Sequence, residues 1–127
     1  VVVDTSGSMS AKQIGMALGS IASYAAAKDV PFVRIIFCDA KATDAGYLAP
    51  EDIAGRVKVT GRGGTILQPG VDCLEQANDF PKDGPILIIT DGEIENDLKV
   101  RREHAFLLPR GNRLPFRARG EVFYFRE

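Results

Sequence analysis

The first side chains able to bind a ligand or to react follow three valines at the start of this 127-residue chain. The segment "DTSGSMS", residues 4–10, offers one carboxylate, that of Asp4, and four hydroxyl groups. A turn needs only one or two such residues, so this density of oxygen atoms points to a binding site. The competing interpretation is structural, because hydroxyls at helix starts commonly satisfy backbone donors as turn or cap residues.

Two further polar clusters occur where strands or extended segments are expected to end. One is "GRGGT", which ends at Thr65, and the other is "TDGE", which contains Asp91. If the strands before Asp4 and Asp91 are neighbours, their carboxylates lie side by side and repel each other unless something positive sits between them. Ser6, Ser8 and Thr65 add neutral oxygens. This oxygen set has no His or Cys member and suits Mg²⁺ or Mn²⁺ rather than zinc.

Each of these residues has an ordinary interpretation as well. Thr65 could be an N-cap after a glycine turn, and Asp91 could belong to a simple Asp-Gly turn. For Asp39 and Glu93 a solvated surface carboxylate is the favoured interpretation, although both could raise the negative potential of the same edge. The occurrence of all the clusters together favours the metal site.

The elements that must position these clusters alternate between strand and helix. Ser10, with Gln13 three residues later, predicts a capping box at the start of a helix. The apolar face of that helix recurs at helical spacing: Ile14, Ala17, Leu18, Ile21, Ala22 and Ala25. Further helices are expected over Pro69–Phe80 and Asn96–Arg102, and strands at residues 1–3, Phe32–Cys38, Pro85–Thr90, from Ala105, and over "EVFYF".

Residues 45–60 are less regular. Here "GYLA" predicts a short edge strand, "PEDIAG" a helical turn, and "RVKV" another strand or extended segment. The alternation predicts an α/β fold with a doubly wound, mainly parallel sheet and a single domain over residues 1–127. The chain begins at Val1 and its first strand looks clipped, so we expect a domain excised from a longer protein.

Composition narrows the function classes. The formal net charge of −1 gives no bulk electrostatic case for nucleic acid or an anionic membrane, and no apolar run approaches the length of a membrane span.

Cys38 and Cys73 match no zinc or redox spacing, and we expect two reduced, buried thiols in a cytoplasmic protein. Tyr47, Tyr124 and the phenylalanines are expected in the core and its strands. Arginines at 101, 102, 110, 113, 117 and 119 form a basic stretch, interpreted as a solvated face, with a polyanion or acidic partner as the alternative.

The spaced residues Asp4-x-Ser6-x-Ser8, then Thr65, then Asp91 resemble the metal-ion-dependent adhesion site of von Willebrand factor A-like (VWA-like) domains. The resemblance runs from Val1 to about residue 93. The tail "AFLLPRGNRLPFRARGEVFYF" and the segment "FCDA" resemble a bacterial subgroup of these domains, which often sits beside a metallopeptidase-like domain.

The resemblance implies a three-layer Rossmann-like fold and a role for each residue. Ser6 and Ser8 would bind Mg²⁺ (or Mn²⁺) directly, and Thr65 directly or through water. Asp4 and Asp91 would bind directly or through water and orient the serines. An open position on the metal would accept an Asp or Glu of a protein partner. Because members of the family work with AAA-type ATPases or beside metallopeptidase-like domains, the resemblance implies such a partner in an intracellular assembly. It implies no binding to nucleic acid or to a membrane.

Two alternatives compete with this non-enzymatic interaction module. A Mg²⁺-dependent hydrolase or phosphoryl-transfer domain is compatible with aspartates at a sheet edge. Against it, "GRGGT" lacks the ending of a P-loop, no G-x-S-x-G or H-E-x-x-H occurs, and Ser6 stands where haloacid-dehalogenase-type phosphatases require a second aspartate. The other alternative is a structural domain that binds no metal.

Overall fold

A computed structural model describes residues 1–6, 9–53 and 66–126 of the chain. Ser8, Thr65 and the expected "RVKV" strand therefore lie outside the described residues. The described elements, in chain order, are β1 (Val2–Asp4), α1 (Ala11–Ala27), β2 (Val33–Cys38), β3 (Ala42–Leu48), α2 (Pro50–Ile53), α3 (Gln68–Gln76), β4 (Ile86–Ile89), β5 (His104–Pro109) and β6 (Glu121–Phe125).

The described strands form one sheet in the order β3-β2-β1-β4-β5-β6. β3 runs antiparallel to β2, and every other neighbouring pair is parallel. In the centre, Val2 pairs with Ile36 of β2 and Ile88 of β4. The first strand and the "ILIIT" strand are therefore neighbours, and the carboxyl ends of β1 and β4 meet at one edge.

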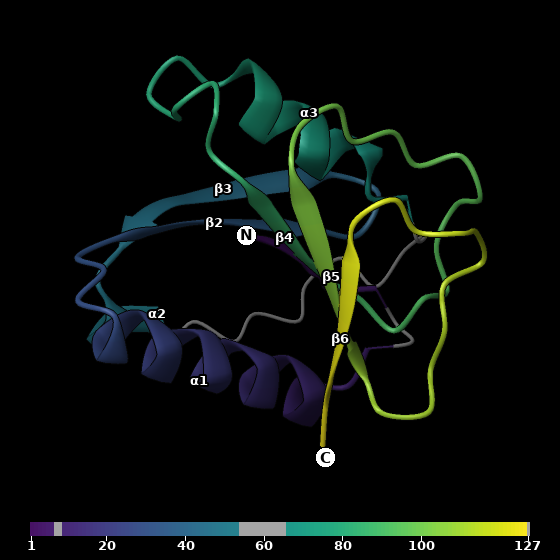
Figure 1. Cartoon of the computed structure of the whole chain (residues 1–127), viewed down its shortest axis with the longest axis horizontal. Coiled ribbons are helices and arrows are strands. Elements are labelled where there is room, and N and C mark those ends of the chain that lie inside the picture. The colour runs from purple at the N-terminus through teal and green to yellow at the C-terminus, as the bar shows by residue number, and fades with distance from the viewer. Residues whose placement is uncertain (7–8, 54–65, 127) are drawn as a thin grey trace.

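Helices cover both faces of this sheet (Figure 1). α1 and α2 lie on one face and α3 lies on the other. Val2 belongs to the core cluster under α3, whereas Val3 belongs to the cluster under α1. Successive side chains of a strand point to opposite faces, so a strand covered on both sides is apolar at every position. The α/β, mainly parallel, three-layer architecture is thus confirmed.

The start of α1 follows the expected local signals. The Ser10 hydroxyl accepts a hydrogen bond from the Gln13 backbone N–H at 3.0 Å, and the Gln13 side-chain oxygen accepts one from the Ser10 N–H at 3.0 Å. These two bonds satisfy donors that a helix start leaves free. The Asp4 segment is therefore followed at once by a firmly started helix.

Helix α3 ends earlier than the sequence suggested. The expected helix over Pro69–Phe80 is observed as Gln68–Gln76, and Ala77 already has an extended backbone. Pro81 disfavours helical conformation at Phe80, because its ring clashes with the preceding residue. The side chain of Phe80 instead lies 5.2 Å from the Arg102 guanidinium, in a cation–π contact.

The expected helix over Asn96–Arg102 is wrong, because this segment forms turns and irregular backbone instead. Its backbone groups bond to side chains of α3. The Lys99 N–H donates to the Gln68 side chain at 2.8 Å, Gln68 donates back to the Lys99 carbonyl, and the Arg101 N–H donates to Glu75 at 2.9 Å. These contacts replace the hydrogen bonds that a local helix would have made.

Several aromatic side chains expected in the core lie at the surface. Tyr47 and Tyr124 are in strands, as expected, but they are 42% and 54% exposed, and Phe32 and Phe123 are similarly exposed. Both tyrosines lie on β3 or β6, the two outer strands of the sheet. A side chain on an outer strand has a neighbouring strand on one side only, which explains the exposure.

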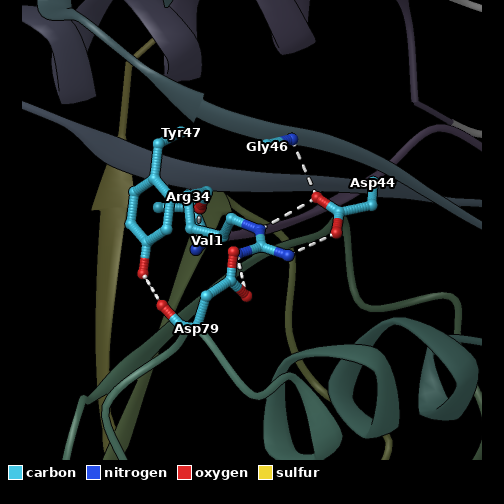
Figure 2. A network of polar contacts seen from close by, with 6 residues as sticks. All are labelled: Val1, Arg34, Asp44, Gly46, Tyr47 and Asp79. Carbon is cyan, nitrogen blue, oxygen red and sulfur yellow. Dashed lines mark hydrogen bonds and ion pairs between the residues drawn. The ribbon is translucent and has the colours of Figure 1, made fainter.

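A buried arginine lies at the opposite end of the central strands from Asp4. The Arg34 guanidinium, near the start of β2, donates to both carboxylate oxygens of Asp44 at 3.0 and 2.5 Å and lies 2.7 Å from an Asp79 carboxylate oxygen. Figure 2 shows it between these two carboxylates, with the Tyr47 hydroxyl donating to the Asp79 carbonyl. This network ties β2 to β3 and to the segment after α3.

The described residues include both cysteines and every helix named above. Cys38 is buried, Cys73 is partly buried, and both are free thiols. No helix in the described ranges combines the length and apolar character that crossing a bilayer requires.

Candidate functional site

Asp4 ends β1 and is fully buried. One oxygen of its carboxylate accepts the Ser6 backbone N–H at 2.9 Å, and the other accepts the Thr90 hydroxyl at 2.7 Å. The Ser6 hydroxyl also hydrogen-bonds to this carboxylate. Asp4 and Ser6 are thus brought together at the end of β1.

Asp91 follows β4 and is only 4% exposed. Its carboxylate accepts the Glu93 backbone N–H at 3.0 Å, which stabilises the turn after the strand. Burial raises the pKa of Asp4 and the negative charge of Asp91 adds to that rise, while the hydrogen bonds from Ser6 and Thr90 oppose it. The structure therefore places the two carboxylates close enough to repel each other at one sheet edge.

No cationic side chain of residues 1–6, 9–53 or 66–126 forms an ion pair with Asp4 or Asp91. Buried carboxylates are ordinarily paired with a cation or coordinate a metal. Within the same ranges, no three His, Cys, Asp or Glu side chains gather into a metal-binding group. The described donors are two carboxylates and the Ser6 hydroxyl. Oxygen donors of this kind fit Mg²⁺ or Mn²⁺.

Ser8 and Thr65 lie outside the described residues, but the backbone that follows Thr65 is described. The Ile66 N–H donates to the Asp39 carbonyl at 3.0 Å, just beyond β2. Asp4 pairs with Cys38 across β1 and β2, so Ile66 is held at the same edge of the sheet as Asp4. Ile66, the first described residue after Thr65, therefore lies near the carboxyl end of β1.

Glu95 is a positioning residue that the sequence did not reveal. Its carboxylate accepts the backbone N–H groups of Leu67, at 2.9 and 3.0 Å, and of Gln68, at 3.0 Å. Leu67 precedes α3 and makes no side-chain cap of its own, so Glu95 satisfies the donors at this helix start. Nothing in the local sequence marks this role, because the partners are 27 and 28 residues apart.

Thr90 is the second residue whose role was missed, although it belongs to the recognised "TDGE" cluster. Its hydroxyl donates to Asp4, 86 residues away in the chain, and accepts the Gly92 N–H at 3.1 Å. One side chain thus joins the ends of β1 and β4. The sequence signal was present, since a threonine directly before Asp91 ends a buried strand.

The loop between β5 and β6 supports the Asp91 turn from the other side. The Asn112 side chain donates to the Asp91 carbonyl at 2.9 Å. Gly92 has φ +91°, and a Cβ placed on it would lie 2.0 Å from the Arg113 carbonyl oxygen. Only glycine fits this close approach of two backbones.

Asp39 and Glu93, the two carboxylates whose role the sequence did not decide, differ from Asp4 and Asp91. Glu93 is exposed, in agreement with a solvated surface group. Asp39 is partly buried, and one of its side-chain oxygens accepts the N–H groups of Ala40 and Lys41, at 2.7 and 3.0 Å. Asp39 therefore has a structural role in the turn after β2.

Comparison with known proteins agrees with this geometry. Residues 1–102 match the model of the VWA-like domain family (DUF2201). No curated protein and no solved structure matches the chain significantly. The matched residues include the whole of β1, β2 and β4 and the positions Asp4, Ser6 and Asp91. The chain therefore belongs to the VWA-like domain family.

Proposed function

We propose that this domain is a metal-dependent protein-interaction module. Mg²⁺ or Mn²⁺ would be held by Asp4, Ser6, Ser8, Thr65 and Asp91. When bound, the metal would supply a positive centre that accepts a carboxylate oxygen from an Asp or Glu of a partner protein. The protein's own contribution is to hold the oxygen donors in place before either the metal or the partner arrives.

The observation that carries the proposal is the buried carboxylate pair, Asp4 and Asp91, which has no cationic side chain among the described residues. Two adjacent carboxylates repel each other, and a divalent cation relieves that repulsion. The hydrogen bond between the Ser6 hydroxyl and Asp4 adds support, because it places a neutral oxygen donor beside the carboxylate pair.

We propose binding rather than catalysis as the role of this chain. The groups that contact the Asp4 and Asp91 side chains among the described residues are the Ser6 and Thr90 hydroxyls and the backbone N–H groups of Ser6 and Glu93, all of which hold the carboxylates in place. A metallopeptidase-like domain or an AAA-type ATPase in a cytoplasmic assembly is the proposed context. A Mg²⁺-dependent hydrolase is the competing proposal.

The direct test is isothermal titration of Mg²⁺ and of Mn²⁺ into protein stripped of metal with EDTA. Wild type should bind, and Asp4→Ala should lose binding, because the carboxylate that orients Ser6 is gone. Asp83→Ala is the matched control, since Asp83 is an exposed carboxylate, and it should bind as wild type does.

Equal binding by wild type and Asp4→Ala would overturn the site, and binding by neither would favour a metal-free structural domain. The alternative function has its own readout. Release of phosphate or of a chromogenic ester product by the Mg²⁺-loaded wild type, lost in Asp4→Ala, would favour the hydrolase.

A further inference from the structure

Beside the candidate metal site lies a surface that the family match does not cover. It consists of Arg110, Arg113, Phe123, Tyr124 and Arg126, which we name the arginine–aromatic patch, and it lines a shallow hollow of about 700 Å³. All five residues lie beyond residue 102, where the match to the family model ends. The family match therefore does not account for the patch.

The patch carries unbalanced positive charge. Its three arginines are exposed, and no described Asp or Glu forms an ion pair with any of them. Phe123 and Tyr124, which are 50% and 54% exposed, are consecutive residues of β6 and stand on its two sides. Arginine, tyrosine and phenylalanine are enriched at protein interfaces, where they contribute a large share of the binding energy.

The patch continues the edge that bears Asp4 and Asp91. β1, β4, β5 and β6 are adjacent and parallel, so their carboxyl ends lie along one edge in that order. Asp4 and Asp91 lie at the ends of β1 and β4, and Arg110 and Arg126 directly follow β5 and β6. Along this edge, negative charge at the candidate metal site gives way to positive charge at the patch.

The two regions are also joined by direct contacts. Asn112, within the hollow, donates to the Asp91 carbonyl at 2.9 Å, and the Arg113 carbonyl lies against Gly92. Arg110 is fixed to the last strand, since its N–H donates to the Phe125 carbonyl at 2.9 Å. A partner bound at the Asp4–Asp91 edge would therefore be next to the patch.

We propose that the arginine–aromatic patch binds a second acidic residue of the same partner segment whose first acidic residue reaches the metal. This inference rests on the proposed function. Neighbouring strands are about 4.8 Å apart, so the ends of β4 and β6 are separated by about 10 Å. An extended chain covers about 3.3 Å per residue, which places the two acidic residues roughly three positions apart.

Charge complementarity favours an acidic protein segment over nucleic acid. A continuous phosphate backbone that reached the patch would also pass Asp4, Asp91 and the exposed Glu93. A peptide can place one carboxylate at the metal, another at the arginines, and uncharged residues between them. The formal net charge of −1 likewise gives no long-range attraction for a polyanion.

The test uses a short fluorescent peptide with two glutamates three positions apart, followed by fluorescence anisotropy with Mg²⁺ and with EDTA. The patch variant combines Arg110→Gln, Arg113→Gln and Arg126→Gln. The control variant combines the same change at three exposed arginines outside the patch, at 101, 117 and 119. Both variants remove three positive charges, so they differ only in where the charges were.

We expect the patch variant to bind the peptide about tenfold more weakly in Mg²⁺, as three exposed charge contacts of modest strength allow. The control variant should stay within about twofold of wild type. A peptide with a single glutamate should bind both variants equally. Mg²⁺ titration into the patch variant should give the wild-type affinity, because the patch holds none of the metal.

If both variants lost peptide affinity equally, the loss would come from net charge and not from the patch, and the proposal would be overturned. Wild-type peptide affinity in the patch variant would also overturn it. Tighter patch-dependent binding of a single-stranded oligonucleotide would overturn the choice of a protein partner.

If wild type bound no Mg²⁺ but only the patch variant lost peptide affinity, the metal-bridging function would fail and the patch would stand. If peptide binding required Mg²⁺ but was the same in the patch variant, the patch would fail and the metal-bridging function would stand.

Discussion

At the scale of single residues, the environment of Asp4 shows how a charged group is kept inside this protein. Its carboxylate accepts the Ser6 N–H, the Ser6 hydroxyl and the Thr90 hydroxyl. These bonds reduce the unfavourable free energy of burying the charge but do not remove it, and the nearby Asp91 adds repulsion. The cation proposed above would offset this repulsion.

The Asp4→Asn substitution tests this balance. In EDTA it should raise the free energy of unfolding by about 1 kcal/mol, because a neutral amide is easier to bury beside Asp91, and because its oxygen can still accept from Ser6 while its NH2 group donates to the Thr90 hydroxyl. In saturating Mg²⁺ wild type should become the more stable protein, since only wild type gains free energy from metal binding.

Urea unfolding followed by circular dichroism, in EDTA and in Mg²⁺, measures both differences. Asp83→Asn serves as the control, because Asp83 is exposed, and it should change neither value. An Asp4→Asn protein that is less stable than wild type in EDTA would show that the carboxylate serves the fold itself.

At the scale of elements, the turn after β4 is positioned from three directions. Thr90 ties it to β1, Asn112 ties it to the loop before β6, and Glu95 ties its far end to the start of α3. Gly92 lies where that loop approaches most closely. The position of Asp91 therefore depends on several elements and not on β4 alone.

Substitution of Gly92 by alanine should displace this turn. Gly92→Ala combines a positive φ with a Cβ 2.0 Å from the Arg113 carbonyl, whereas Gly111→Ala has a similar φ of +96° and meets nothing within 4 Å. We expect Gly111→Ala to lose about 1 kcal/mol of unfolding free energy and Gly92→Ala about 3 kcal/mol or more.

Thermal and urea unfolding of both variants, beside wild type, check this difference. The Gly111→Ala control isolates the cost of the backbone conformation, so any excess loss in Gly92→Ala reports the close contact. Equal losses would contradict the close packing of the β5–β6 loop against the Asp91 turn.

At the scale of the whole molecule, two polar centres lie at opposite edges of one sheet. The Arg34 network lies near the start of β2, and the Asp4–Asp91 pair lies at the carboxyl ends of β1 and β4. In the first centre a cation balances two carboxylates, as Figure 2 shows, and the hydrogen bonds from Arg34 lower the pKa of Asp44. In the second, the described residues provide no such cation.

The Arg34 network predicts how stability depends on pH. The pKa of Asp44 is lower in the folded protein than its usual value of 3.8, so the unfolded chain binds a proton more readily. The stabilisation is therefore complete above about pH 5 and is lost as the pH falls below about 4. Asp44→Asn should lower the unfolding free energy by about 1 kcal/mol at pH 7, since Asp44 is about one third exposed and partly screened.

Urea unfolding of wild type and Asp44→Asn between pH 7 and pH 3 measures this dependence. The gap between the two proteins should close as the pH falls through the Asp44 titration. Asp83→Asn should show no gap at any pH. A constant gap for Asp44→Asn would mean that its effect comes from packing and not from charge.

The sequence by itself determined what neighbouring residues decide. The capping box at Ser10, the apolar runs of β1, β2 and β4, and the residue limits of β6 all follow from local pattern, and the structure agrees. The pattern also placed Asp4 and Asp91 each directly after a strand, although only the strand order of the structure showed that these two strands are neighbours. Local signals suffice there because hydrogen bonds and alternation act over a few residues.

Tertiary structure alone decided the features that depend on distant partners. The segment expected as a helix over Asn96–Arg102 is irregular because Gln68 and Glu75 of α3 bond to its backbone. Glu95 became the cap of α3, and Thr90 became the link to Asp4, through contacts between residues far apart in the chain. Such contacts exist only after the sheet has assembled, because the order of its strands differs from their order in the sequence.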